Sequence, residues 1–392
     1  MIKKIFFVLL LTLLFFLTSC NTRQNKENKL IEFLKEESIF NFTELKETIV
    51  NNIDNDSIKV NINDIYNEYL LKLDSLENVS DISKLTKDYK NKIYNQIPIN
   101  TNELELKNLS SDEKNKICKL LDQYLYRTNL IGIPLSKSYR LNLNSTSVIS
   151  WEYFFGENGV NKQTPREEYW DIKPILSNEY FLRGINLCLD KELFNKYDIL
   201  NVDSQIDYSN YDYYNYNLEK AKKYFKLALT EFVETNIYSP TPNDPIILNI
   251  EIAYGQFTAS NKCEEIHSIL KKSIEDTFNS NEVSNGNFLI NVSSWEGEYF
   301  GQIFSEKLYC GKFDISFDKI SGSALDFNPY KEYLLCSSNI KISNNLTVNW
   351  SHDTSSTYYD CIVYNGYKYS YDEVLLALNA NLNKWIKNSK VQ

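Results

Sequence analysis

The first 131 residues of this chain contain no glycine and a single proline, Pro98. Hairpin turns and helix C-caps favour glycine, because glycine adopts positive φ angles without a steric cost. A long stretch without glycine therefore favours helices that are joined by polar links. One short segment, Ile58–Ile62, alternates apolar and polar residues and could instead form a strand.

Apolar residues recur at helical spacing in three parts of this stretch, each after a residue that can cap a helix. The first part follows Asn63 and the second follows Ser80. The third begins with Ser110 and Glu113, which form a capping-box pattern, and it ends at Gly132. The sequence thus predicts a helical layer up to about residue 130. The apolar positions are Ile65, Tyr69, Leu73 and Leu76, then Ile82, Leu85, Tyr89 and Ile93, then Ile117, Leu120, Leu121, Tyr124 and Leu125.

Helical patterns continue beyond this layer and predict a helix-rich domain over residues 29–240. Ser177–Tyr197 could form a helix, and Leu218–Val233 is amphipathic, with Asn217 before it as an N-cap. Asp207–Asn217 contains five tyrosines among asparagine and aspartate residues, which predicts an exposed loop.

The proline-rich segment Ser239–Pro245 is the strongest break in the chain and predicts a domain boundary. After it, over residues 246–392, we expect a mixed domain with antiparallel strands that ends in a helix. Asn365–Gly366 fits the type I′ turn of a hairpin, and Ser370–Glu373 is a capping box before the last helix. The fold class is therefore α+β, with a helix-rich N-terminal part and a β-richer C-terminal part. Expected strands are 288–292, 299–304, 313–317, 340–342 and 346–350; 262–278 is an expected helix, and 246–257 could be either.

Residues 1–19 have the pattern of a signal peptide. Lys3 and Lys4 give a positive start, and Ile5–Leu17 is an uncharged apolar run of 13 residues. A helix that spans a bilayer needs about 20 apolar residues, so this run is short for a permanent anchor. The tetrapeptide Leu17-Thr18-Ser19-Cys20 that follows resembles the lipobox of bacterial lipoproteins.

This resemblance implies that the chain is cleaved before Cys20 and that the Cys20 thiol carries a diacyl lipid with chains such as palmitate. Two acyl chains hold a protein at a membrane, whereas one binds only marginally. Residues 20–28 would then be a polar tether. Asn21 is not the aspartate that retains such proteins at the inner membrane in enteric-type sorting, so the outer membrane is expected. The alternatives are an ordinary cleaved signal with a chance cysteine, or an uncleaved anchor.

Charge and motif content argue against several partners. Removal of residues 1–19 leaves 373 of the 392 residues and changes the formal net charge from −10 to −12. An acidic chain repels phosphate backbones, so nucleic acid is not an expected partner. The sequence lacks both the GxxxxGK and the GxGxxG loop, which argues against a nucleotide. His267 and His352 are the only histidines, so no metal site and no cofactor are expected.

The cysteines beyond Cys20 leave two readings open. Their even number permits up to three disulfides in an exported chain, with a connectivity that the sequence does not determine. They could equally be buried thiols that pack as small apolar side chains. The six are Cys118, Cys188, Cys263, Cys310, Cys336 and Cys361.

The best candidate for chemistry is the pentapeptide Trp295-Glu296-Gly297-Glu298-Tyr299. On a strand, Glu296 and Glu298 would point to one face about 7 Å apart, where two carboxylates could act as acid and base on a glycoside. Trp295 and Tyr299 beside them are candidate ligand-binding aromatics. The carboxylate pair could also bind calcium together with Asp314 and Asp318, although the EF-hand spacing is missing.

Tyrosine is abundant, with 29 residues, and its flat ring with a polar end suits interfaces. Low-GC codon usage is an alternative explanation for this abundance. Our leading hypothesis is a membrane-anchored envelope lipoprotein that is not an enzyme and that binds or assembles with a glycan or another envelope protein. The alternative is a carboxylate-dependent glycan hydrolase that uses Glu296 and Glu298.

Overall fold

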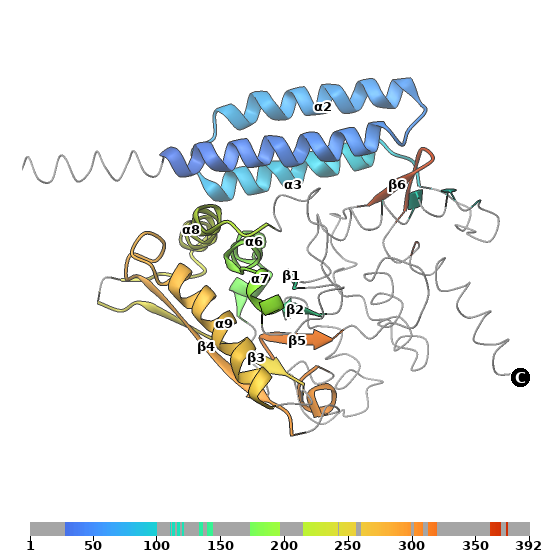
Figure 1. The fold of residues 1–392 in the computed structure, drawn as a ribbon. Helices are drawn as coiled ribbons and strands as arrows, with labels where there is room; N and C mark the ends of the chain where they lie inside the picture. The colour runs from blue at the N-terminus through green and yellow to red at the C-terminus, as the bar shows by residue number, and fades with distance from the viewer. Residues whose placement is uncertain are drawn as a thin grey trace, which may run out of the picture. The chain divides into compact units, whose positions relative to one another are not determined.

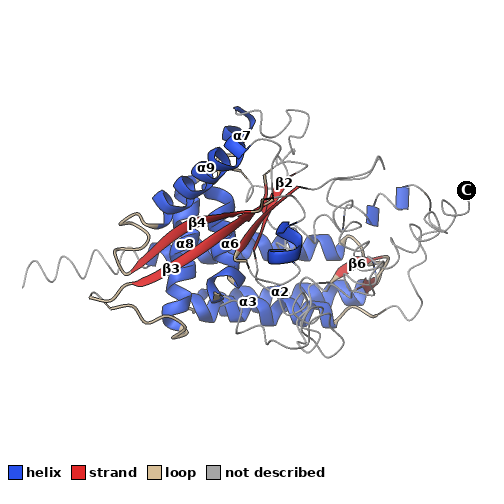
Figure 2. Ribbon diagram, turned by 90° about the horizontal axis from the view of Figure 1, so that it is seen from below, coloured by secondary structure: helices blue, strands red, loops and turns tan. Residues whose placement is uncertain are grey.

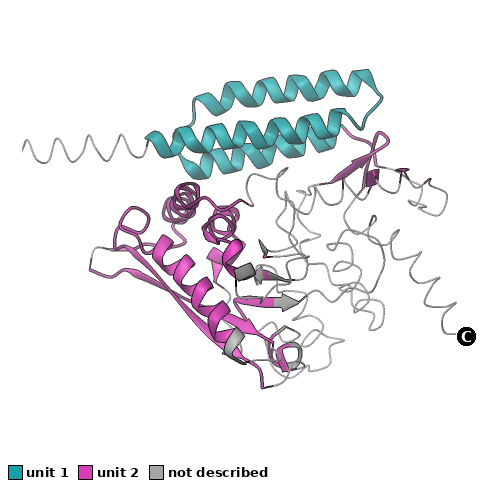
Figure 3. Ribbon diagram, viewed as in Figure 1, with its two compact units in different colours: residues 1–96 teal, residues 97–392 magenta. Residues whose placement is uncertain are grey.

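The computed structural model describes ten segments of the chain, which form helices and β-strands (Figures 1 and 2). By its internal contacts the chain divides into two compact units, residues 1–96 and 97–392 (Figure 3). The described residues are 28–99, 133–135, 139–143, 173–196, 215–241, 243–255, 260–298, 302–308, 313–319 and 361–369, with the single positions Ser110, Asp112, Glu113, Lys116, Ile117, Leu120 and Val374.

The first unit consists, in its described part, of a helix over residues 28–50 followed by α2 (Asp56–Asp74) and α3 (Val79–Asn95). Helix α2 begins before Asn63, because Asn55 caps it by accepting hydrogen bonds from the backbone N–H groups of Ser57 and Ile58. The strand expected at 58–62 is therefore wrong. Ile58 and Ile62 are also four residues apart on one helix face, and Ile62 is fully buried there.

Buried tyrosines form part of the core of this unit. The rings of Phe42 and Tyr69 have centroids 4.3 Å apart, and those of Tyr69 and Tyr89 are 5.8 Å apart. The hydroxyls are satisfied at the rim of the core, because Tyr69 Oη lies 3.1 Å from Thr86 Oγ1 and Tyr89 Oη donates to Glu68 Oε1 at 2.5 Å. Part of the tyrosine content thus serves packing with a hydrogen-bonded end.

The second unit contains a mixed sheet with the order β1-β2-β5-β3-β4. β3 runs parallel to β4 and to β5, whereas β2 is antiparallel to β1 and to β5, so the expectation of antiparallel strands holds for only part of the sheet. Parallel neighbours need a crossover connection, and α9 (Ser260–Phe278) provides it between β3 and β4. The strands are β1 (Ile133–Pro134), β2 (Tyr139–Leu143), β3 (Ile246–Tyr254), β4 (Phe288–Glu296) and β5 (Ile315–Lys319).

The two faces of β3 and β4 differ. One face is apolar and buried, with Leu248, Ile250, Phe288, Ile290 and Val292, and α9 lies along it (Figures 1 and 2). The other face carries exposed side chains near the start of both strands, among them Ile247, Asn249, Leu289 and Asn291. The alternation is the usual consequence of side chains that point to opposite faces at successive positions.

Helices η3 (Pro174–Ser177), α6 (Glu179–Cys188), α7 (Glu192–Lys196) and α8 (Leu218–Glu234) belong to the same unit as the sheet. Asn217 caps α8 by accepting from the Lys220 N–H at 3.0 Å, which confirms the sequence prediction. The ring of Phe225 in α8 lies 5.3 Å from that of Phe278 in α9. Ser239–Pro245 therefore joins elements of one unit, and the division of the chain lies at residue 96 rather than at 240–246.

Two further local predictions are confirmed. The hairpin of β6 (Ile362–Tyr364) and β7 (Tyr367–Tyr369) turns at Asn365 and Gly366, whose φ angles are 47° and 80°. The Ser110 N–H donates to Glu113 Oε2 at 2.9 Å and the Glu113 N–H donates to Ser110 Oγ at 3.3 Å, as in a capping box.

The strand expected at 299–304 is contradicted where it is described, because Ile303–Leu308 forms the π-helix η6. Ile303 and Lys307 are both buried on this short helix. Strands 340–342 and 346–350, the loop before residue 215 and the C-terminal helix beyond Val374 lie outside the described residues. The described parts nevertheless establish an α+β fold, helix-rich first and with strands later. Among the described helices, none combines the length and apolarity that crossing a membrane would require.

Candidate functional site

The predicted carboxylate pair does not lie on one strand. Glu296 is the last residue of β4, and the Gly297 N–H that follows donates to the Tyr254 carbonyl at 3.2 Å. Glu298 lies beyond the strand, where its N–H donates to Gln302 Oε1 at 2.6 Å. Both glutamates are exposed. The strand ends too early for the alternation that the sequence analysis assumed.

Glu296 instead lies beside Cys263 on α9. Burial, together with the Glu296 carboxylate, raises the pKa of the Cys263 thiol to about 12, so this reduced cysteine stays protonated at neutral pH. A thiol in that state packs and is not a nucleophile. His267, one turn further along α9, has its Nδ1 atom 3.1 Å from the hydroxyl of buried Tyr254. Burial and Lys271 lower the His267 pKa.

Trp295 is a packing residue on the second face of the sheet. It contacts a buried cluster of Ala253, Ile303 and Phe313, and the Lys307 ammonium lies 4.9 Å from its ring centroid. The Trp295 ring therefore packs against the protein itself on this face of the sheet. Of the other candidates, Tyr299 and the lipidation residue Cys20 lie outside the described residues, and so do Cys118, Cys310 and Cys336.

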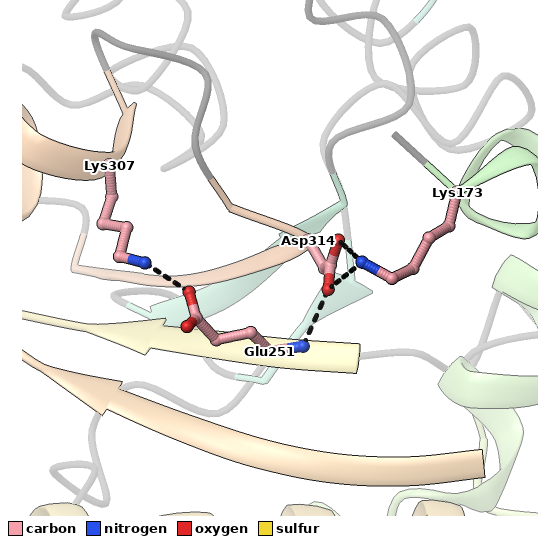
Figure 4. A network of polar contacts seen from close by, with 4 residues as sticks. All are labelled: Lys173, Glu251, Lys307 and Asp314. Carbon is pink, nitrogen blue, oxygen red and sulfur yellow. Dashed lines mark hydrogen bonds and ion pairs between the residues drawn. The ribbon is translucent and has the colours of Figure 1, made fainter. Parts of the chain in front are cut away.

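Instead, the structure brings together four charged residues on that second face, around Asp314 (Figure 4). Asp314 is 1 % exposed. Its carboxylate accepts hydrogen bonds from the Lys173 ammonium at 2.8 and 2.9 Å and from the Glu251 backbone N–H at 2.8 Å. The pairing of β3 with β5 starts only at Ile252 and Ile315, so the Asp314 side chain takes the N–H that β5 does not reach.

The second half of this network joins Glu251 to Lys307 of η6. Lys307 Nζ lies 2.5 Å from Glu251 Oε1, and Lys307 is 8 % exposed. The two carboxylates and two ammonium groups balance in charge, as buried ions require. They fasten the start of η3, strands β3 and β5, and η6 to one another.

Ser316 extends this cluster, because it lies on β5 two residues after Asp314 and hence on the same face. Its side chain is fully buried, and its Oγ atom has no hydrogen-bond partner among the described residues. No group of three or more His, Cys, Asp or Glu side chains within the described ranges is arranged to hold a metal ion. The cluster thus presents paired charges and one hydroxyl, without a nucleophile activated by a base.

Sequence reasoning missed Lys173, Glu251 and Lys307 and considered Asp314 only as a calcium ligand. A usable signal existed, since Asp314 stands between Phe313 and Ile315 and Glu251 between Ile250 and Ile252, and a charge in such apolar surroundings is rarely buried without a partner. The partners themselves could not be named, because Lys173 and Asp314 are 141 residues apart. The sequence matches no protein-family model, and no curated protein is similar enough to indicate a family.

Proposed function

We propose that this chain is a lipid-anchored envelope protein whose folded part binds a glycan or another envelope protein. The observation that carries the proposal is the order of a basic start, an apolar run of 13 residues and Leu17-Thr18-Ser19-Cys20. The lipid on Cys20 would hold the chain at the membrane, with the outer membrane as the expected site, and the polar residues up to 28 would separate it from the first helix.

The described geometry favours binding over hydrolysis. Glu296 and Glu298 are exposed and do not share a strand, and the buried carboxylate of Asp314 is bound by a lysine. Glycoside hydrolysis needs one carboxyl group that stays protonated and a second that is ionised across the bond. The Asp314 carboxylate is already occupied by hydrogen bonds from Lys173 and from the Glu251 backbone N–H, so it is not positioned as one of such a pair.

The lipid is tested by metabolic labelling. Cells that produce the chain are fed an alkyne analogue of palmitate, and we expect label on the wild type and on Cys263→Ser but none on Cys20→Ser. The Cys20→Ser chain should also leave the membrane fraction. Label that persists in Cys20→Ser would exclude the proposed anchor.

Binding and hydrolysis are separated with isolated cell-wall glycan and a panel of polysaccharides. We expect retention of the protein without release of reducing ends. Release that disappears in Glu296→Gln, but not in Glu265→Gln on the exposed face of α9, would establish the hydrolase instead. Absence of both retention and release would exclude glycans as partners and leave an envelope protein, which crosslinking in the membrane would identify.

A further inference from the structure

Strand β4 lies at the end of the sheet, and one side of its backbone has no neighbouring strand among the described residues. The Asn287 carbonyl accepts from the Ile246 N–H at 3.0 Å, and the Gly297 N–H donates to the Tyr254 carbonyl at 3.2 Å. Odd-numbered residues of this strand thus bond to β3. Because backbone groups alternate along a strand, the N–H and C=O groups of residues 288, 290, 292, 294 and 296 point away from β3, towards the edge.

Two side chains occupy the centre of that edge. Asn279, directly after α9, donates from Nδ2 to the Ile290 carbonyl at 3.0 Å and accepts the Ile290 N–H on Oδ1 at 2.8 Å. Glu275, in the last turn of α9, accepts the Val292 N–H on Oε1 at 2.7 Å. The Asn279 amide thereby makes the same pair of hydrogen bonds to Ile290 that a residue of an adjacent strand would make.

An unprotected strand edge is a template for pairing with another chain, and natural sheets block such edges with side chains or bulges. β4 is nine residues long, and the exposed side chains of its open face include Leu289, which is 37 % exposed. β4 of a second copy would match this edge in length and in its alternation of side chains. Such a strand could bond to Ile290 and Val292 only by displacing Asn279 and Glu275.

We propose that Asn279 and Glu275 form an edge guard, which closes β4 to strand addition by a second copy of this chain. The edge guard competes with an added strand for the same hydrogen bonds. Its two side chains already bind the Ile290 N–H, the Ile290 carbonyl and the Val292 N–H, three backbone groups that such a strand would need. The Asn279 backbone N–H donates to the Glu275 carbonyl at 2.9 Å and ends the helix, which leaves its side chain available for the strand.

The test uses the full chain in detergent, with the double variant Glu275→Ala/Asn279→Ala. The matched control is Asn249→Ala/Asn291→Ala, which removes the 3.1 Å hydrogen bond between two exposed amides on the open face of the same strands. Sedimentation velocity over a range of concentrations measures self-association. A labelled peptide with the sequence of residues 288–296 probes the edge directly, and hydrogen exchange reports on the Ile290 and Val292 amides.

We expect the guard variant to self-associate and to bind the peptide about tenfold or more tightly than the wild type or the control, with about tenfold faster exchange at Ile290 and Val292. Faster exchange in a variant that stays monomeric and ignores the peptide would overturn the proposal, because Asn279 would then only fasten α9 to β4. If the double variant does not fold, Asn279→Asp decides: it keeps the acceptor for the Ile290 N–H and loses the donor. An Asn279→Asp chain as monomeric and as inert to the peptide as the wild type also overturns the proposal.

Discussion

At the scale of single residues, buried charge is the most informative feature of this protein. Asp314 is nearly inaccessible, and its carboxylate is bound by groups from distant segments, among them the Lys173 ammonium and the Glu251 N–H. A buried ion of this kind is costly without its partner, even where the pair as a whole contributes little net stability. Removal of one partner should therefore lower the free energy of unfolding by more than the pair as a whole contributes to it.

We expect Asp314→Asn to lower the free energy of unfolding of the second unit by about 3 kcal/mol, because it leaves Lys173 without its carboxylate. Urea unfolding measures the change. Glu219→Gln is the control, since the Glu219 carboxylate is 74 % exposed in its 2.8 Å pair with Lys222, and its loss should cost less than about 1 kcal/mol. Equal effects of the two substitutions would show that Asp314 is not held as an ion pair.

Gly184 is a second position where one residue controls packing. A Cβ atom on Gly184 would lie 2.5 Å from Cδ1 of Phe225, so α6 and α8 approach closely only because this residue is glycine. Gly184→Ala should destabilise the unit by about 1–3 kcal/mol through overpacking. Because the clash is with the Phe225 ring, Gly184→Ala should cost less in a Phe225→Leu background. A double-mutant cycle of unfolding free energies in which the effects of Gly184→Ala and Phe225→Leu are additive would contradict this explanation.

At the scale of elements, Glu68 joins α2 to α3. Its carboxylate lies 2.8 Å from the Lys72 ammonium and accepts a hydrogen bond from the Tyr89 hydroxyl on α3, while Lys92 Nζ lies 3.6 Å away. The hydrogen bond from Lys72 has the largest effect and that from the Tyr89 hydroxyl the next largest, and together they lower the pKa of Glu68 from 4.5 to about 2. The pairing of these helices therefore includes a contribution that depends on pH.

A carboxylate whose pKa is lower in the folded state stabilises the fold above its unfolded pKa and loses that effect as the pH falls. The contribution of Glu68 should thus be complete above pH 4.5 and disappear as the pH falls towards 2. Glu68→Gln should remove this part of the acid sensitivity, whereas Asp64→Asn, an exposed change on the same helix, should leave it. An NMR titration of the Glu68 carboxyl group with a midpoint near 4.5 would contradict the assignment.

At the scale of the whole molecule, the chain consists of two compact units, and the first has its own core. The ring contacts of Phe42, Tyr69 and Tyr89 join all three described helical segments of residues 28–96. All three rings belong to residues 28–96, so this core lies within the first unit.

We expect a fragment of residues 28–96 to fold alone and to show helical circular dichroism with one cooperative thermal transition. Within the fragment, Phe42→Ala should lower the free energy of unfolding by about 3–5 kcal/mol, because it leaves a cavity at the centre of the ring cluster. The control is Leu71→Ala, at a side chain that is 78 % exposed and should matter little. A fragment that unfolds gradually, without a transition, would show that the unit depends on the rest of the chain.

The sequence by itself determined those features whose interactions span only a few residues. The Asn217 cap, the Ser110–Glu113 capping box and the Asn365–Gly366 turn are of this kind, and so is the lipobox resemblance, which stays a prediction. At 58–62, where a strand was one possibility, and at the described end of the strand expected at 299–304, the chain is helical instead.

Only the tertiary structure decided which distant residues meet. The parallel pairing of β3 with β4 and β5, the end of β4 before Glu298, and the joining of Lys173 to Asp314 across 141 residues depend on how the strands are ordered and in what register they pair. Many partners satisfy the same local pattern equally well, so burial and hydrogen bonding in the assembled sheet select among them. For that reason Glu296 and Glu298 do not form the predicted pair, whereas the neighbouring helix α9 was predicted from its local pattern and η6 was not.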